Sequence, residues 1–227
     1  MMEWRQLSNE QRVDVRKALE KHVEENITGF NVIEKSSSRV MRFFSFVLFF
    51  VPGFMTNFVT TFYPKVYVPS KERWEANHSN TVMLLAHEYV HLRDRKRLGP
   101  LFNFIYLSPQ VLVLLALLAP LNLWFLFSLF FLLPLPSPGR MWAELRGYRM
   151  TIAVYYWMTG VEYNLGYIAN HFTGQNYYWM WPFRSHIENL LEKEYNKIKN
   201  DDLAPELREV KEVLTKAGLT CYPHVRR

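Results

Sequence analysis

Cysteine is nearly absent from this sequence, since Cys221 is the single one among 227 residues. A lone cysteine cannot form an intramolecular disulfide, so a disulfide-stapled scaffold is excluded and a reducing compartment is compatible. The polar N-terminal segment lacks the apolar stretch of a secretory signal peptide. We therefore expect the fold to be held by a hydrophobic core.

Acidic residues are too few to balance the basic ones, and the 27 Lys and Arg against 21 Asp and Glu leave a net charge of +6. No recognised nucleic-acid-binding motif is present, so we expect no nucleic acid partner. The basic residues instead cluster beside apolar segments, at 39–42 and 93–97. This placement favours an anionic membrane surface.

The composition is that of a folded chain, with 49% hydrophobic and 16% aromatic residues. We expect one mainly helical α+β domain over 1–227, with a hydrophobic insert at 101–136 and polar helices at 185–227. Helical periodicity also predicts a helix over 8–28, where Ser8 and Gln11 suit a capping box. Short strands are expected at 30–35 and 57–62.

Prolines flank the alternating segment 65–68, at Pro64 and Pro69. Proline cannot donate a hydrogen bond to a β-ladder, so we expect this segment to be an edge strand. A helix follows it, with N-cap candidates at Asn77, Ser79 and Asn80, and ends at Leu98 before Gly99 and Pro100.

The residues HEYVH at 87–91 form an HExxH motif on this predicted helix. His87 and His91 lie on one helical face and can hold one ion, while Glu88 lies about 100° around the helix. Glu88 can therefore take a proton from a metal-bound water without being a ligand. The alternative is a helix whose histidines are ordinary surface or core groups.

Zinc needs a third protein ligand, and Glu144 on a later helix is the preferred candidate. Gly147, three residues on, would let that helix pass close to the HExxH helix. Asp94 lies on the same face of the helix as His91 and is poorly placed to be the third ligand. We therefore expect Asp94 to be a surface charge or a hydrogen-bond acceptor for a ligand histidine. The lesser ligand candidates are Glu162, His171, His186 and Glu188.

The segments AHEYVH (86–91) and AELRGYR (143–149) resemble gluzincin metallopeptidases, whose third zinc ligand is a glutamate on a following helix. Membrane-embedded gluzincins, of the CAAX prenyl protease and heat-shock protease type, look similar in placing hydrophobic segments between the two motifs. TTFYPKVYVPS (60–70) looks like the strand before the active helix of compact zincins. LAHEYVHLRDRKRLGP (85–100) resembles small uncharacterised zincin-like proteins of phages and bacteria.

The resemblance covers roughly residues 58–150 and implies a minimal gluzincin fold and peptide-bond hydrolysis with one Zn²⁺ ion. His87, His91 and Glu144 would be the ligands and Glu88 the base and acid. The departure is Gly147, where many relatives carry alanine. An oxyanion stabiliser is usually His, Tyr or Arg, and Tyr178, His171 and His186 are the candidates.

If His91 and Glu144 bind one ion, both ends of the apolar insert between them must lie at the same place. We expect a shallow or re-entrant hairpin, with arms at 101–119 and 123–133 and a turn at 119–122, rather than one span. The apolar run 43–51 is expected to be an interfacial helix, so that both segments contact membrane lipid. Flanking basic residues predict an active site facing the cytoplasm.

Three alternatives stay open. The hairpin can instead be buried in a soluble or virion-associated assembly. The metal can be structural, in a non-catalytic component of a membrane or virion assembly. The HExxH motif can also be accidental, in which case changing Glu88 or His87 alters neither metal content nor activity. The peptide or protein substrate and the oligomeric state are not readable from the sequence.

Overall fold

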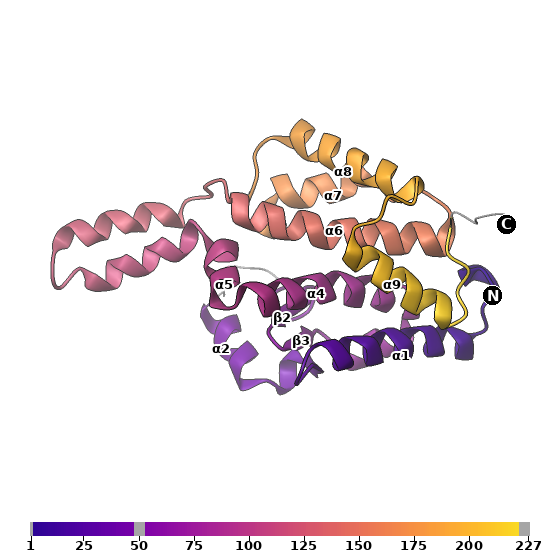
Figure 1. Cartoon of the computed structure of the whole chain (residues 1–227). Helices are drawn as coiled ribbons and strands as arrows, with labels where there is room; N and C mark the ends of the chain where they lie inside the picture. Colours follow the sequence, from indigo (N-terminus) through magenta and orange to yellow (C-terminus); the bar gives the residue numbers. More distant parts are fainter. Residues whose placement is uncertain (1, 48–52, 223–227) are drawn as a thin grey trace.

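A computed structural model describes residues 2–47 and 53–222 of the chain as a helical body from which one hairpin projects (Figure 1). Its α-helices are α1 (Asn9–Asn26), α2 (Arg39–Val47), α3 (Lys71–Ala76), α4 (His78–Leu98), α5 (Pro100–Leu107), α6 (Pro138–Thr159), α7 (Leu165–Thr173), α8 (Arg184–Lys199) and α9 (Pro205–Lys216). Its 3-10 helices are η1 (Trp4–Gln6), η2 (Lys35–Ser37), η3 (Gln110–Leu118), η4 (Leu123–Leu132) and η5 (Gln175–Tyr177). The strands are β1 (Asn31–Glu34), β2 (Thr60–Phe62) and β3 (Lys65–Val68). The expected mainly helical α+β class is confirmed.

Helix α1 begins as its sequence predicts. The Ser8 side chain accepts a hydrogen bond from the Gln11 backbone, and the Gln11 side chain accepts one from the Ser8 backbone. This reciprocal capping box satisfies two backbone donors that the first turn of a helix leaves without partners. The helix buries Val15, Leu19 and Val23 against the body.

Helix α4 occupies the centre of the molecule, with α1 on one side and α6 on another (Figure 1). The Asn77 side chain caps its start by accepting from the Asn80 backbone, and Gly99 ends it with a positive φ of 60°. Neighbours on several sides bury both polar and apolar residues of its middle. The middle of α4 is therefore packed against other elements on several sides.

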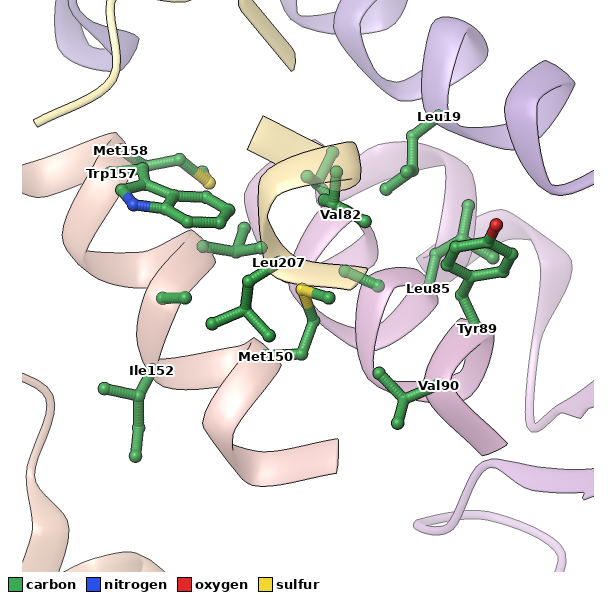
Figure 2. Close-up of a cluster of buried hydrophobic side chains, with 14 of the residues drawn as sticks. Leu19, Val82, Leu85, Tyr89, Val90, Met150, Ile152, Trp157, Met158 and Leu207 are labelled. Atoms are coloured by element: carbon green, nitrogen blue, oxygen red, sulfur yellow. The ribbon is translucent and has the colours of Figure 1, made fainter. Parts of the chain in front are cut away.

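The hydrophobic core lies where α1, α4, α6 and α9 meet (Figure 2). Val82 and Leu85 of α4 point toward Leu19 of α1, while Met150 and Trp157 come from α6. All five side chains have no exposed surface. One core cluster runs from Trp4 to Cys221, so both ends of the chain support the α4–α6 pair.

The sheet has the order β1-β3-β2, with β1 parallel and β2 antiparallel to β3. The expectation of an edge strand at 65–68 is therefore wrong, because β3 is the central strand. Pro64 and Pro69 lie just outside the paired residues, so every ladder position of β3 keeps its backbone N–H. The edge strand that packs against α4 is β2.

The insert forms a hairpin in which η3 and η4 run side by side (Figure 1). The predicted first arm, 101–119, is divided at Ser108 and Pro109, where α5 and η3 meet at 97°. Both ends return to one place, since Ser137 donates to the carbonyl of Ser108 and Arg140 Nε donates to the carbonyl of Tyr106 at 3.2 Å. The arms are 3-10 helices.

Among the described residues, no single helix is both long and apolar enough to cross a membrane, although α5 and η3 together meet the length and composition test as a bent pair. The apolar run 43–51 is described only as far as residue 47, where α2 ends, and residues 48–51 lie outside the described part of the chain.

Candidate metal centre

Two neighbouring helices bring the predicted ligands together. His87 and His91 project from α4, and Glu144 projects from α6, which packs along it. The two Nε2 atoms lie 3.1 Å apart, and they lie 3.6 and 3.8 Å from the Glu144 oxygens. The three side chains are 3 to 9% exposed. They form the single such His/Cys/Asp/Glu group found in residues 2–47 and 53–222.

These separations are close enough for the three side chains to share one zinc ion. Two metal bonds of about 2.1 Å at a tetrahedral angle place their donor atoms about 3.4 Å apart. The His87–His91 and His87–Glu144 pairs lie close to that value, and one donor atom from each of the three residues lies within 4.8 Å of the other two. In addition, Oε2 of Glu144 is buried and has no hydrogen-bond partner within the described residues. A buried carboxylate oxygen in that state is costly unless a cation satisfies it.

Gly147 makes the close approach of the two helices sterically feasible. A Cβ atom at this position would lie 2.5 Å from Nε2 and 2.6 Å from Cε1 of His87. The sequence-based interpretation of Gly147 is thus confirmed. An alanine here would require the His87 ring to move.

A threonine rather than an aspartate orients a ligand histidine. Thr151, one turn beyond Gly147, places its Oγ1 3.1 Å from Nδ1 of His87, which directs Nε2 toward the other ligands. Asp94 instead accepts two hydrogen bonds from Arg146, at 2.9 and 3.0 Å. His91 Nδ1 has no partner among the described residues, so the predicted contact from Asp94 to a ligand histidine is absent there.

Glu88 lies beside the ligands without joining them. Its Oε2 accepts a 2.6 Å hydrogen bond from the Thr61 hydroxyl of β2. This contact ties the edge strand to the HExxH helix and holds one carboxylate oxygen. Glu88 is 8% exposed, so few water molecules compete for the carboxylate.

Helix α5 lies over the centre at the root of the hairpin. The Tyr106 hydroxyl donates a 2.5 Å hydrogen bond to Oε1 of Glu144. The Tyr106 and Phe102 rings pack against His91, with centroids 6.2 and 6.3 Å away. On the opposite ligand, Tyr148 packs edge-on against His87 at 5.0 Å. Aromatic rings thus shield both histidines from most of the solvent.

The electrostatics favour an anionic glutamate facing imidazoles. Burial raises the pKa of Glu144, but the nearby His87 and His91 and the hydrogen bond from Tyr106 outweigh it and lower the pKa to about 2. Burial lowers the pKa of His91, which keeps that ring neutral and able to bind a metal. Burial acts in the same direction on His87, but Glu144 and Glu88 reverse it, so its pKa is raised.

The remaining candidates from the sequence, apart from His171, make their described contacts with other parts of the chain. Tyr178 donates its hydroxyl to the carbonyl of Leu132 at the end of the hairpin. His186 packs against Trp181, and Glu188 pairs with Arg184 at 2.7 Å. Glu162 follows the end of α6 and is exposed.

His171 is connected to the centre through one aromatic ring, since it stacks on Tyr148 with centroids 6.0 Å apart. Burial lowers the pKa of His171. Among the three proposed oxyanion stabilisers, His171 therefore has the clearest link to a ligand, through the ring that packs on His87.

Sequence reasoning missed Thr61, Thr151 and Tyr106, which all touch the proposed site. Thr151 is detectable, because it lies four residues after Gly147 and seven after Glu144, on one face of the helix. Tyr106 is the single tyrosine of the segment 101–136, and a lone phenol in an apolar run calls for a hydrogen-bond partner. Thr61 carries no such signal.

No protein-family model matches the chain, and no curated protein or solved structure shows significant similarity to it. Inference about function therefore starts from the arrangement of the site itself.

Proposed function

We propose that the protein is a zinc-dependent endopeptidase of gluzincin type, held at a membrane by its apolar insert. The observation that carries the proposal is the convergence of His87, His91 and Glu144, whose donor atoms lie within 4.8 Å of one another. An accidental HExxH would give no reason for Glu144, which is 53 residues further along the chain, to meet both histidines.

The residues divide the chemistry among them. His87, His91 and Glu144 would hold the ion, leaving a fourth position for water, and zinc supplies Lewis acidity that lowers the pKa of such a water to about 7. Glu88 accepts the proton of the attacking water and returns it to the leaving amine. The Thr61 hydroxyl holds Glu88 in one orientation, and Thr151 fixes the ring of His87.

Strand β2 supports a peptide as the substrate. It lies at the border of the sheet next to α4, and its Thr61 contacts the proposed base. An extended peptide that added to this edge would run past Glu88, with backbone hydrogen bonds setting its register.

The test combines metal content with cleavage of casein or a peptide library. The wild type should contain one zinc ion per chain and cleave, and chelation should abolish cleavage. Glu88→Gln should retain zinc and lose at least about 100-fold in kcat. His91→Ala should lose zinc. A wild type that binds no zinc would refute the metal assignment.

A structural zinc site in a non-catalytic assembly component is the second candidate. It is supported by the cover that Phe102 and Tyr106 place over His91. A structural site fills its fourth position with protein. This candidate is favoured if zinc is bound stoichiometrically, no substrate is cleaved, and Glu88→Gln leaves both metal affinity and assembly unchanged.

A further inference from the structure

The hairpin of η3 and η4 exposes apolar side chains on most of its surface. A 3-10 helix repeats every three residues, so each arm has three faces. On η3, two faces carry exposed leucines, at Leu114, Leu115, Leu117 and Leu118. On η4, two faces are likewise exposed, at Leu123, Trp124, Leu126, Phe127, Leu129, Phe130 and Leu132.

Ser128 and Asn122 each find a hydrogen-bond partner within the hairpin. Ser128 faces the other arm, where its hydroxyl is buried and lies 2.7 Å from the carbonyl of Phe125 and 3.4 Å from that of Val113. At the tip, the Asn122 side chain accepts from the Trp124 backbone. The polar Ser128 thus faces inward while large apolar side chains face outward, an arrangement that suits hydrocarbon surroundings.

Charged residues are absent from the hairpin and gather beside its two ends. From Gly99 to Gly139 no acidic or basic residue occurs, whereas Arg95, Lys96 and Arg97 precede this stretch and Arg140 follows it. A second basic and apolar element, α2, is drawn in Figure 1 at the end from which the hairpin projects. Val40, Phe43 and Phe46 form an exposed face on α2 beside its two arginines.

We propose that residues 110–133 are a monotopic anchor that enters one leaflet of an anionic bilayer, with α2 lying flat among the headgroups. A protein groove would cover one face of a hairpin, whereas this hairpin is apolar on two of three faces of both arms. Ten residues of 3-10 helix span about 20 Å. That length passes one leaflet of about 15 Å but not a hydrocarbon core of about 30 Å.

The anchor also sets the position of the metal centre relative to the bilayer. Helix α5 leads directly into η3, and its Tyr106 bonds to Glu144. The centre therefore lies at the root of the anchor, at the level of the headgroups. If the chain is a peptidase, its substrates are peptide segments at the bilayer surface. This consequence rests on the proposed peptidase activity, whereas the anchor, which extends the proposed membrane attachment, does not depend on that activity.

Flotation with vesicles tests the anchor. The full-length protein is mixed with phosphatidylcholine vesicles, with or without phosphatidylglycerol, and we expect it to float best with the anionic ones. Leu117→Glu and Phe127→Glu should each lower the partition coefficient about 50-fold or more, because acidic groups are costly in hydrocarbon. Val161→Glu is the matched control, since Val161 is also exposed but follows the end of α6, outside the hairpin, and it should float like the wild type.

Each variant is first shown to melt like the wild type, so that loss of flotation cannot come from unfolding. A wild type that stays in solution with both kinds of vesicle overturns the proposal. So does a wild type that forms larger assemblies which Phe127→Glu dissolves without any vesicle binding, because the occupant is then a protein. Equal flotation of all four proteins also overturns it.

Insertion depth is tested at the tip. Leu121→Cys, in a Cys221→Ala background, gives one accessible thiol on a residue that is 80% exposed. Protein added from outside should not react with a membrane-impermeant maleimide trapped inside the vesicles. Reaction from inside would show a span and overturn the one-leaflet anchor. Zinc content and peptide cleavage are measured separately, so failure of the metal proposal leaves this result interpretable.

Discussion

Substitution of Gly147 by alanine isolates the steric requirement of the metal centre. The added Cβ would lie 2.5 Å from Nε2 of His87. Non-bonded heavy atoms prefer a separation of about 3.5 Å, so the His87 ring must move away by about 1 Å. Metal–ligand distances tolerate only about 0.2 Å, so the bond from His87 would be lost. We expect zinc affinity to fall by about 100-fold or more.

Overpacking should also destabilise the metal-free protein. The helices α4 and α6 are packed along their length, so relief of the clash costs about 1 to 3 kcal/mol. In a chain of this size that cost lowers Tm by about 2 to 12 °C. Chelator competition measures the affinity, and thermal unfolding in excess chelator measures the stability.

Gly166→Ala provides the control for a glycine in a helix. A Cβ at Gly166 would lie 3.4 Å from Oδ1 of Asn164, an ordinary contact that involves no ligand. This variant should bind zinc like the wild type. If Gly147→Ala also binds zinc like the wild type, the reasoning that links Gly147 to the position of His87 is refuted.

Three further predictions concern groups around the site and the fold. Thr151→Val should weaken zinc binding about 10- to 100-fold in chelator competition, because the ring of His87 loses its orienting partner. Burial lowers the pKa of Lys35 from 10.5 to about 8, so the unfolded chain binds more protons between these values. The free energy of unfolding in urea should therefore rise by up to about 3 kcal/mol from pH 8 to 10.5, and Lys35→Met should remove the rise. Ser8→Ala should cost about 1 kcal/mol in the same assay, and an unchanged midpoint would contradict the role of the cap.

Local features were accessible from the sequence because they depend on neighbours along the chain. The capping box at Ser8 and the stop at Gly99 follow from backbone groups a few residues away. His87 and His91 share a face for the same reason, since helical periodicity alone aligns them. The pairing order of the strands was not accessible, because Pro64 and Pro69 constrain only their own positions and leave β3 free to take two partners.

The sequence by itself therefore determined the elements, the candidate ligands and the requirement that the apolar insert leave and return. Only the tertiary structure decided that Glu144 meets both histidines, that Thr151 rather than Asp94 orients His87, and that Tyr106 connects the hairpin to the centre. Those contacts join residues 38 to 64 positions apart. No local propensity encodes such contacts, because they depend on how α4, α5 and α6 pack.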